Sequence, residues 1–277
     1  MVKNSSLPDR YALVGHPVKH SRSPLIHEIF ARQTGENLTY ELIDAEPGSF
    51  EVAVRSFAEA GGRGLNVTVP HKAAAFALVD EISDPANTAR AVNTISIVGG
   101  KLRGENTDGI GLVRDLILNQ GVTLPGRRVF LLGAGGAARG IVAALLAVRP
   151  AELVIANRTK SRADELVRQF RTPAALRAAA LDELESLAPF DLLINATSAG
   201  LTGPMPALPG SLVGPESVAY DIVYGAHDSP FIEWARARGA ARALKGWGML
   251  VEQAAESFFI WRGVRPDTTP VLQQLAR

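Results

Sequence analysis

The sequence predicts an α/β protein of two domains, and three observations support this prediction. The chain has 277 residues, close to two domains of about 150 residues each. Strand-like and helix-like segments alternate along most of it, which is typical of parallel sheets covered by helices. One apolar strand also runs directly into a glycine-rich turn and an apolar helix. That pattern places a helix N-terminus where it can bind phosphate.

Composition and charge exclude several classes of protein. Apolar residues make up 47% and charged residues 21%, which is ordinary for a globular protein and too apolar for a disordered chain. Lys and Arg (29) nearly balance Asp and Glu (28), so no global field attracts nucleic acid or an anionic membrane. The lack of cysteine excludes a disulfide scaffold, a thiol nucleophile and a Cys-ligated metal site. We expect no metal site, no nucleic acid and no membrane partner.

No segment has the pattern of an export signal or a membrane span. The N-terminus has no long apolar core before its charges, so it does not resemble a signal peptide. The longest apolar stretches, 129–138 and 140–148, are far shorter than the roughly 20 residues that cross a bilayer. We therefore expect a cytoplasmic enzyme or binding protein.

The N-terminal part begins with a strand and a helix. Tyr11 to Val14 form a short apolar strand that ends at Gly15. Ser23 is expected to be the N-cap of the next helix and Pro24 its first helical residue, because serine and proline favour these positions. The apolar face of this helix consists of Leu25, Ile26, Ile29 and Phe30.

The next elements alternate in type. Apolar and β-branched residues predict strands over 38–43 and 64–69. Pro70 is expected to start a helix that continues through Leu78. The segments 95–98 and 101–103, separated by two glycines, predict a hairpin with a two-residue turn.

A helix and a polar loop lead into the second domain. Thr107 is expected to cap a helix, and its apolar positions are Ile110, Val113, Leu116 and Ile117. We place the domain boundary here, between 108 and 126. The predicted domains are 1–107 together with 246–277, and 108–245. A late amphipathic helix, Met249 to Trp261, has Leu250, Ala254, Phe258 and Trp261 on one side, and we expect it to return to the first domain.

The glycine-rich turn carries the clearest local signal. The strand Arg127 to Leu132 leads into a G-x-G-x-x-A pattern and then an apolar helix. Gly133 permits the tight turn, Gly135 lets the backbone approach a pyrophosphate, and Ala138 allows close helix–strand packing. The sequence therefore predicts a dinucleotide site, although a plain tight turn is the alternative.

The following strand, Glu152 to Ala156, indicates which dinucleotide binds. An NAD site usually has an acidic residue at this strand end, which hydrogen-bonds the ribose 2′-hydroxyl. This chain has none there, and a cluster of cations and hydroxyls follows instead: Arg158, Thr159, Lys160, Ser161 and Arg162. Because arginine can grip a phosphate with two hydrogen bonds, the cluster favours NADP over NAD. The alternative is a solvated basic turn.

Three groups of polar residues lie at the ends of predicted elements in the first 108 residues. Ser21 and Ser23 flank the start of the first helix, where hydroxyls beside a helix N-terminus can bind a carboxylate. Lys72 lies in the first turn of its helix, a place that disfavours the charged amine. Asp108 opens the helix after the hairpin, and a carboxylate near the lysine would favour the charged form again.

Each of these residues also has an ordinary structural interpretation. The serines can be a turn residue and an N-cap, the lysine an exposed surface residue, and the aspartate a complement to the helix dipole. Asn93 is equally ambiguous, and His71 could be a base but more often such a residue packs locally. Beside an NADP domain, however, these groups indicate hydride transfer on a small alcohol or ketone that carries a carboxylate.

Nine segments, in this order, resemble the shikimate dehydrogenase family. They span most of the chain, so the resemblance is far more specific than one glycine-rich turn. The segments are GHPVKHSRSPLIH (15–27), NVTVPHK (66–72), AVNT (91–94), GENTDG (104–109), GAGGAAR (133–139), NRT (157–159), NATSAG (195–200), DIVY (221–224) and GWGMLVEQA (246–254).

The resemblance implies a fold and an activity. The fold has an N-terminal α/β substrate domain and a Rossmann-type doubly wound domain, with NADP in the cleft between them. The activity is the reversible reduction of 3-dehydroshikimate to shikimate with NADPH, on the route to chorismate and the aromatic amino acids. The family members are usually homodimers.

The matching motifs also imply residue roles. Lys72 and Asp108 match the catalytic pair. Other residues match groups that bind the substrate: Ser21, Ser23 and Thr68 at its carboxylate, Asn93 and Gln253 at its ring hydroxyls, and Tyr224 beside it. The positions that match NADP contacts are Gly133, Ala134, Gly135, Gly136, Ala137, Asn157, Arg158, Thr159, Lys160, Ser161 and Arg162, with Ile222 and Gly246 on the nicotinamide side.

Two departures from the family pattern stand out. Many members continue Asn-Pro-x-x-Thr after the tyrosine, whereas this chain has Gly225 to Ser229, and Leu201 replaces a methionine. Two other functions stay open. One is a quinate/shikimate dehydrogenase that uses NAD, and the other is a non-catalytic NADP-binding sensor on the same fold.

Overall fold

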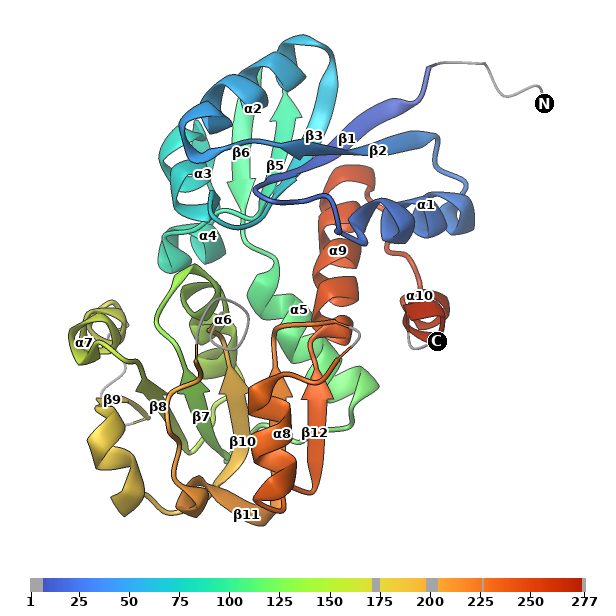
Figure 1. Ribbon diagram of the computed structural model, residues 1–277. Coiled ribbons are helices and arrows are strands. Elements are labelled where there is room, and N and C mark those ends of the chain that lie inside the picture. Colours follow the sequence, from blue (N-terminus) through green and yellow to red (C-terminus); the bar gives the residue numbers. More distant parts are fainter. Residues whose placement is uncertain (1–6, 171–174, 198–203, 226, 276–277) are drawn as a thin grey trace. The chain divides into compact units, whose positions relative to one another are not determined.

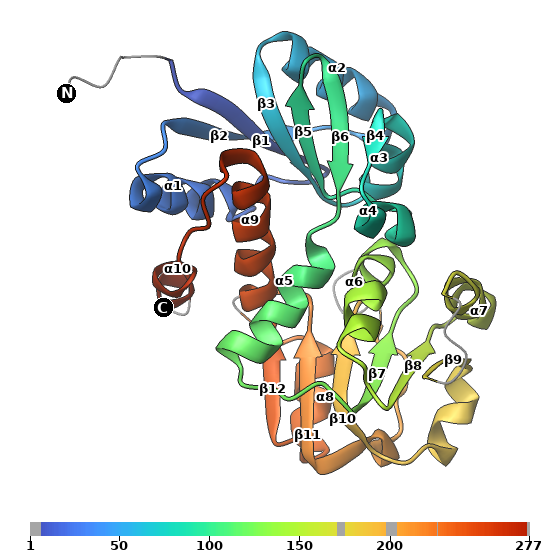
Figure 2. The same cartoon turned by 180° about the vertical axis from the view of Figure 1, so that it is seen from behind.

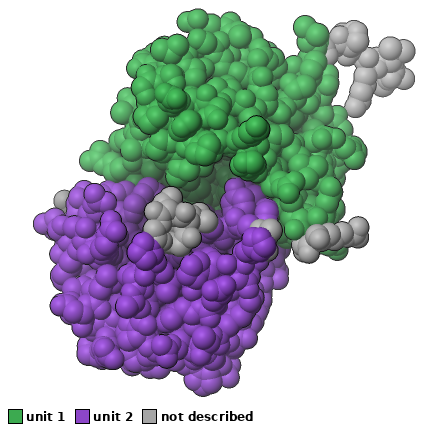
Figure 3. Space-filling view, viewed as in Figure 1, with its two compact units in different colours: residues 1–111, 251–277 green, residues 112–250 purple. Residues whose placement is uncertain are grey.

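The computed structural model describes residues 7–170, 175–197, 204–225 and 227–275, which form two compact units (Figures 1 and 3). Unit 1 comprises residues 1–111 and 251–277, and unit 2 comprises residues 112–250. The divisions fall inside helices α5 (Asp108–Arg114) and α9 (Trp247–Arg262). The domains expected from sequence, 1–107 with 246–277 and 108–245, differ from these units by a few residues at each division.

Unit 1 contains a mixed sheet. β1 pairs in parallel with β2 and β3, whereas β5 pairs antiparallel with β3 and β6. The predicted hairpin is confirmed: Gly99 and Gly100 both have positive φ, as a two-residue turn requires. In sheet order the strands are β2 (Leu38–Asp44), β1 (Asp9–Gly15), β3 (Gly62–Val67), β5 (Thr94–Val98), β6 (Lys101–Glu105) and β4 (Glu81–Ile82).

Helices cover both faces of this sheet. Alternate residues of a strand point to opposite faces, so Ala12 and Val14 pack with α2 and α3, whereas Tyr11 stacks on Trp261 of α9. Figure 2 shows α1 and α9 near each other, and their aromatic residues Phe30 and Phe258 are in contact. The helices are α1 (Ser23–Thr34), η1 (Pro47–Ser49), α2 (Phe50–Glu59), α3 (Lys72–Leu78), α4 (Asp84–Ala89) and α10 (Thr269–Leu275).

Two predicted helix starts are wrong by one or two residues. Ser23 is the first residue of α1 rather than its N-cap, which is Arg22, because the carbonyl oxygen of Arg22 already accepts the helical hydrogen bond from the N–H of Ile26 at 3.1 Å. α3 begins at Lys72 rather than Pro70. The chain first makes a turn after β3, so the strand predicted over 64–69 also ends earlier, at Val67.

The predicted apolar face of the helix that begins at Asp108 is half right. Leu116 is fully buried and Val113 packs against the core, as predicted, whereas Ile110 and Ile117 are each 40% exposed and Leu112 is buried in their place. The reason lies in the packing of Gly111, where an added Cβ would lie 2.7 Å from the Cβ of Gln253. This close approach sets which side of the helix is covered, and a π-helical turn, η2 (Asp115–Asn119), follows it. By contrast, Ala254 and Phe258 of α9 are buried, as predicted.

Unit 2 is a doubly wound α/β domain. Its sheet has the order β12-β11-β10-β7-β8-β9, and every pair in the described residues is parallel. Numbered within the unit, this is the order 6-5-4-1-2-3 of a Rossmann domain. The strands are β7 (Arg128–Leu132), β8 (Glu152–Ala156), β9 (Leu176–Ala179), β10 (Phe190–Asn195), β11 (Val213–Asp221) and β12 (Arg242–Lys245).

The helices of unit 2 lie over a sheet whose central strands are largely apolar. Leu131 and Ile194 pack with Ile141 of α6 on one face, and Phe130 and Leu193 pack on the other. Strands buried on both faces explain why these segments read as continuous apolar runs. The helices are α6 (Gly136–Ala147), α7 (Lys160–Arg168), η3 (Leu181–Ser186), η4 (Gly210–Leu212) and α8 (Pro230–Ala237). In the described part of the chain, every helix is too short or too polar to cross a membrane.

Candidate active site

A lysine and an aspartate meet in unit 1. Lys72 opens α3 and Asp108 opens α5, and Nζ of Lys72 lies 2.5 Å from Oδ2 of Asp108. Their side chains are 17% and 6% exposed. A cation in the first turn of a helix is disfavoured by the helix dipole, and the carboxylate compensates for this cost. The amine is thus held at a defined point while part of it stays open to a ligand.

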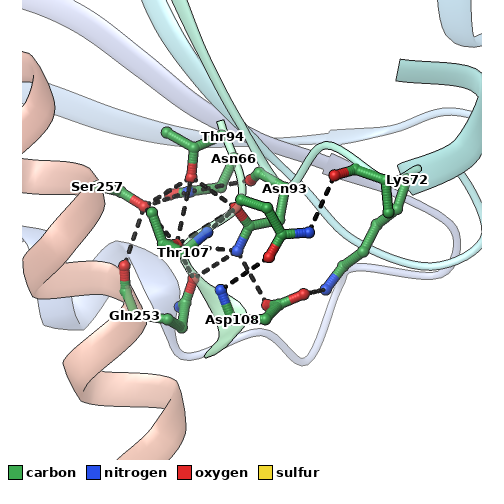
Figure 4. A network of polar contacts seen from close by, with 10 residues as sticks. Asn66, Lys72, Asn93, Thr94, Thr107, Asp108, Gln253 and Ser257 are labelled. Carbon is green, nitrogen blue, oxygen red and sulfur yellow. Dashed lines mark hydrogen bonds and ion pairs between the residues drawn. The ribbon is translucent and has the colours of Figure 1, made fainter. Parts of the chain in front are cut away.

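Asn93 orients the carboxylate from its other side. Its Nδ2 donates to Oδ1 of Asp108 at 2.9 Å and to Oγ1 of Thr107 at 2.9 Å (Figure 4). Its Oδ1 accepts the backbone N–H of Thr107 at 2.8 Å. Since a backbone N–H can only donate, this contact determines which way the amide points. Both oxygens of Asp108 therefore have a named donor.

The contacts continue into a buried polar network behind the pair. Oε1 of Gln253 lies 3.4 Å from Nδ2 of Asn93. Nδ2 of Asn66 donates to the hydroxyl of Ser257 at 2.9 Å, and that hydroxyl lies 2.8 Å from Oγ1 of Thr94 (Figure 4). The network joins β3, β5, α5 and α9, so it depends on tertiary packing. Four of these residues had no site role expected from the sequence: Asn66, Thr94, Thr107 and Ser257.

The predicted carboxylate-binding serines lie together at the start of α1. Their hydroxyl oxygens are 3.1 Å apart, and Ser23 is buried whereas Ser21 is partly exposed. Thr68 follows β3, and its methyl group fits against Gly15, where an added Cβ would lie 2.3 Å away. Close to Ser23, the hydroxyl of Tyr40 donates to Oδ1 of Asn66 at 2.8 Å. Burial raises the pKa of Tyr40, which keeps this hydroxyl protonated.

His71 packs locally. Its ring stacks on Phe50 at 4.6 Å between ring centres, and Nε2 lies 2.7 Å from the carbonyl oxygen of Ala45. The side chain is buried. Of the two interpretations of this histidine, the geometry favours the structural one.

The glycine-rich turn of unit 2 contains two kinds of glycine. Gly133 has φ +118°, and an added Cβ would lie 2.9 Å from the carbonyl oxygen of Ala196, so the fold itself requires glycine there. Among the residues that the structure describes, an added Cβ at Gly135 or Gly136 would meet no atom within 4 Å. Gly135 precedes α6, whose N-terminus has no side-chain cap. This open backbone face beside a helix N-terminus suits a pyrophosphate.

Exposed cations and hydroxyls follow β8. Lys160 pairs with Asp164 at 3.0 Å, whereas Arg158 and Arg162 form no ion pair with any residue that the structure describes. Nδ2 of Asn157 donates to the carbonyl oxygen of Thr159 at 2.9 Å and shapes the turn before α7. Two exposed guanidinium groups beside a helix N-terminus suit an additional phosphate.

Ile222 and Gly246 are neighbours in unit 2. An added Cβ at Gly246 would lie 2.4 Å from the carbonyl oxygen of Ile222, so glycine allows these two segments to touch. Tyr224 is 37% exposed, and its ring centre lies 4.9 Å from that of Trp247. The sequence departures at Leu201 and at Ala226 lie outside the described residues.

Comparisons with known proteins agree with these features. Three family descriptions match the chain: the shikimate dehydrogenase substrate binding domain over residues 13–95, shikimate/quinate 5-dehydrogenase over 116–202, and the shikimate 5′-dehydrogenase C-terminal domain over 246–276. A shikimate dehydrogenase (NADP(+)) of Alkalilimnicola ehrlichii is 54% identical over 97% of this chain and 99% of its own.

Solved structures agree as well. An Ael1 enzyme from Pseudomonas putida has a TM-score of 0.91 and 46% identity, covering 96% of this chain and 98% of its own. Shikimate 5-dehydrogenase from Thermus thermophilus, in complex with NADP(H) and shikimate, has a TM-score of 0.85 and 35% identity, covering 96% and 97%. The chain belongs to the shikimate dehydrogenase family.

Proposed function

We propose that this protein is an NADP-dependent shikimate dehydrogenase, which reversibly reduces 3-dehydroshikimate to shikimate on the route to chorismate and the aromatic amino acids. The observation that carries this proposal is the contact between Lys72 and Asp108, inside a network that contains Asn93 and Gln253. Such a buried, oriented amine and carboxylate can serve general acid–base chemistry.

The proton moves through Lys72. NADPH, when bound, supplies the hydride that reduces the ketone carbon. As negative charge develops on the ketone oxygen, the ammonium of Lys72 donates a proton to it. Asp108 holds the ammonium at its position through Oδ2 and is itself oriented by Asn93. In the oxidation direction, the neutral amine accepts the hydroxyl proton.

The remaining substrate contacts are proposed from the family motifs that these residues match. Ser21, Ser23 and Thr68 are assigned to the substrate carboxylate, which is supported by the two serine hydroxyls lying together at the start of α1. Asn93 and Gln253 are assigned to the ring hydroxyls, and Tyr224 to a further substrate contact. We assign unit 1 to substrate binding and unit 2 to NADP binding.

The residues of unit 2 fit NADP. The open face at Gly135 and Gly136 suits the pyrophosphate, and Arg158 and Arg162 suit the 2′-phosphate. The further residues that would hold the cofactor are Gly133, Ala134, Ala137, Asn157, Thr159, Lys160 and Ser161, with Ile222 and Gly246 at the nicotinamide.

A spectrophotometric assay tests this function. The purified protein is mixed with NADP and shikimate, and NADPH absorbance is followed. We expect rapid reduction of NADP with shikimate, and much lower kcat/KM with NAD or with quinate. Equal or better turnover with NAD and quinate would instead indicate a quinate/shikimate dehydrogenase. NADP binding without any turnover would indicate a sensor.

Assembly and location stay predictions. The expectation of a homodimer is tested by sedimentation velocity of the purified protein, which separates one chain of 29.4 kDa from two. The expectation of a cytoplasmic location is tested by cell fractionation.

A further inference from the structure

Two polar residues are buried at the carboxyl edge of the unit 2 sheet. Asn195 ends β10 and Asp221 ends β11, and the two are directly paired in these neighbouring strands (Figure 1). Neither has any exposed surface. In doubly wound sheets the carboxyl edge is where ligands bind. A buried carboxylate at this edge calls for an explanation, because burying a charge is costly unless it is hydrogen-bonded.

Asp221 holds both ends of one segment. Its Oδ1 accepts the N–H of Val223 at 3.0 Å, and its Oδ2 accepts the hydroxyl of Ser229. Ser229 in turn accepts the N–H of Ile232 at 3.3 Å and is the N-cap of α8. One carboxylate therefore binds the chain directly after β11 and again just before the next helix.

Asn195 completes the arrangement from β10. Its Oδ1 accepts the N–H of Thr197 at 3.1 Å and the hydroxyl of Thr197 at 2.7 Å, so its Nδ2 faces Asp221 and donates to Oδ1 at 3.1 Å. Its backbone carbonyl accepts the N–H of Ile222 at 3.0 Å. Burial raises the pKa of Asp221, and the donors Ser229, Val223 and Asn195 oppose that rise.

The segment held in this way carries the positions assigned to the nicotinamide side. Ile222 touches Gly246, and the N–H of Gly246 donates to the carbonyl oxygen of Val223 at 3.3 Å. Tyr224 follows directly. Hydride transfer is sensitive to small displacements of the reacting groups, so a residue that fixes this segment affects the rate without touching the cofactor.

We propose that Asp221 is a positioning residue for the nicotinamide end of the cofactor, acting through Val223 and Ser229. The proposal rests on the function proposed above and deepens it. The phosphate end is built differently, from the turn after β7 and the cationic residues after β8. Loss of Asp221 should therefore affect the two ends of NADP unequally.

The test compares whole-cofactor and fragment binding. The variants are Asp221→Ala, Ser229→Ala and Ser229→Thr. For each we measure kcat, the Kd of NADP and the Kd of adenosine 2′,5′-bisphosphate, a fragment that contains the adenosine and its phosphates but not the nicotinamide. Asp221→Ala should lower kcat about 100-fold and weaken NADP about tenfold, with the fragment affinity changed less than about twofold. Ser229→Ala should show a smaller loss of the same kind, and Ser229→Thr should recover most of it because the hydroxyl remains.

Asp191→Ala is the matched control. Asp191 lies at the opposite end of β10 and accepts the N–H of Arg128 at 2.7 Å, so this variant also loses a carboxylate that binds backbone. It should keep kcat. The proposal is overturned if a folded Asp221→Ala variant retains kcat, or if NADP and the fragment weaken equally. If Asp221→Ala does not fold, the Ser229 pair carries the same test. If the wild type does not oxidise shikimate, the proposed function fails, and the binding comparison still tests Asp221.

Discussion

The candidate sites of the two units are built in opposite ways. In unit 1, Lys72, Asp108 and Asn93 are held by side-chain hydrogen bonds and are largely buried. In unit 2, the turn at Gly135 exposes the backbone N–H groups at the start of α6, and Arg158, after the next strand, is exposed. The first site is preorganised by its own side chains, and the second by the course of the chain.

This difference follows from the chemistry proposed for each site. Proton transfer requires atoms at defined positions, and a buried network keeps them there without reorganisation. Binding a pyrophosphate requires backbone N–H groups and space, which a strand–turn–helix supplies without any particular side chain. Substitutions should therefore act through side-chain chemistry in unit 1 and through steric fit or charge in unit 2.

The largest effect is expected at Lys72. Lys72→Ala removes the proton donor and should lower kcat at least about 100-fold, with a modest change in the KM for shikimate. Steady-state kinetics measure both. Lys101→Ala is the control, because Lys101 is an exposed lysine of unit 1 that pairs with Glu81. An unchanged kcat in Lys72→Ala would remove Lys72 from the mechanism.

The two kinds of glycine in unit 2 should separate folding from binding. Gly133→Ala forces a Cβ against Ala196 at positive φ and should lower the free energy of unfolding by about 1–3 kcal/mol. The added Cβ of Gly135→Ala has no described atom within 4 Å, so this variant should leave unfolding nearly unchanged but raise the Kd of NADP about tenfold. Urea denaturation and fluorescence titration measure these quantities. If both variants lose only stability, the open face at Gly135 is not a ligand site.

Acid should destabilise unit 1 through His27. This ring is fully buried and stacks on Tyr40 at 4.1 Å, and burial lowers its pKa from 6.5 to about 3, although Asn66 favours the charged form. The unfolded chain therefore binds a proton that the folded chain does not. The resulting stability is fully present above pH 6.5 and is lost as pH falls toward 3.

At pH 5 the expected loss is about 2 kcal/mol relative to neutral pH, since one pKa unit corresponds to about 1.4 kcal/mol. His27→Phe keeps an aromatic ring and should remove this part of the pH dependence. Urea denaturation at neutral pH and at pH 5 gives, for each protein, the change in the free energy of unfolding between the two pH values. An equal change in both proteins would mean that His27 does not cause this loss of stability at acid pH.

A smaller effect is expected at the adenosine end of the cofactor. Arg158→Ala removes a guanidinium group and should raise the KM for NADP about tenfold, with little change for NAD. Arg168→Ala, at the last residue of helix α7, which follows Arg158, is the control. A parallel loss with NAD and NADP would show that Arg158 does not recognise the 2′-phosphate.

Local pattern predicts much of the fold. The strands of unit 2 and the turn at Gly133 follow from apolar runs and glycine placement, which are properties of neighbouring residues. The apolar face of α5 follows only in part, because Gly111 lies against Gln253 from a distant part of the chain. The start of α1, where the hydroxyl of Ser21 accepts the N–H of Ser23, does not follow.

The candidate site divides in the same way. Lys72, Asp108, Ser21 and Ser23 stand at element ends, where polar residues are conspicuous in the sequence. Asn66, Thr94 and Ser257 lie within strands or a helix and are buried. Their role can be seen only when β3, β5 and α9 are packed together, because Ser257 is the hydrogen-bond partner of both Asn66 and Thr94.

The sequence by itself determined the α/β class, the dinucleotide turn and the preference for NADP, because each depends on residues within a few positions of one another. Only the tertiary structure decided which distant polar groups meet. The family motifs implied that Lys72 and Asp108 act together, but the contact between them, and the buried support behind it, depend on strand register and helix packing. No local pattern in the sequence predicts those long-range contacts.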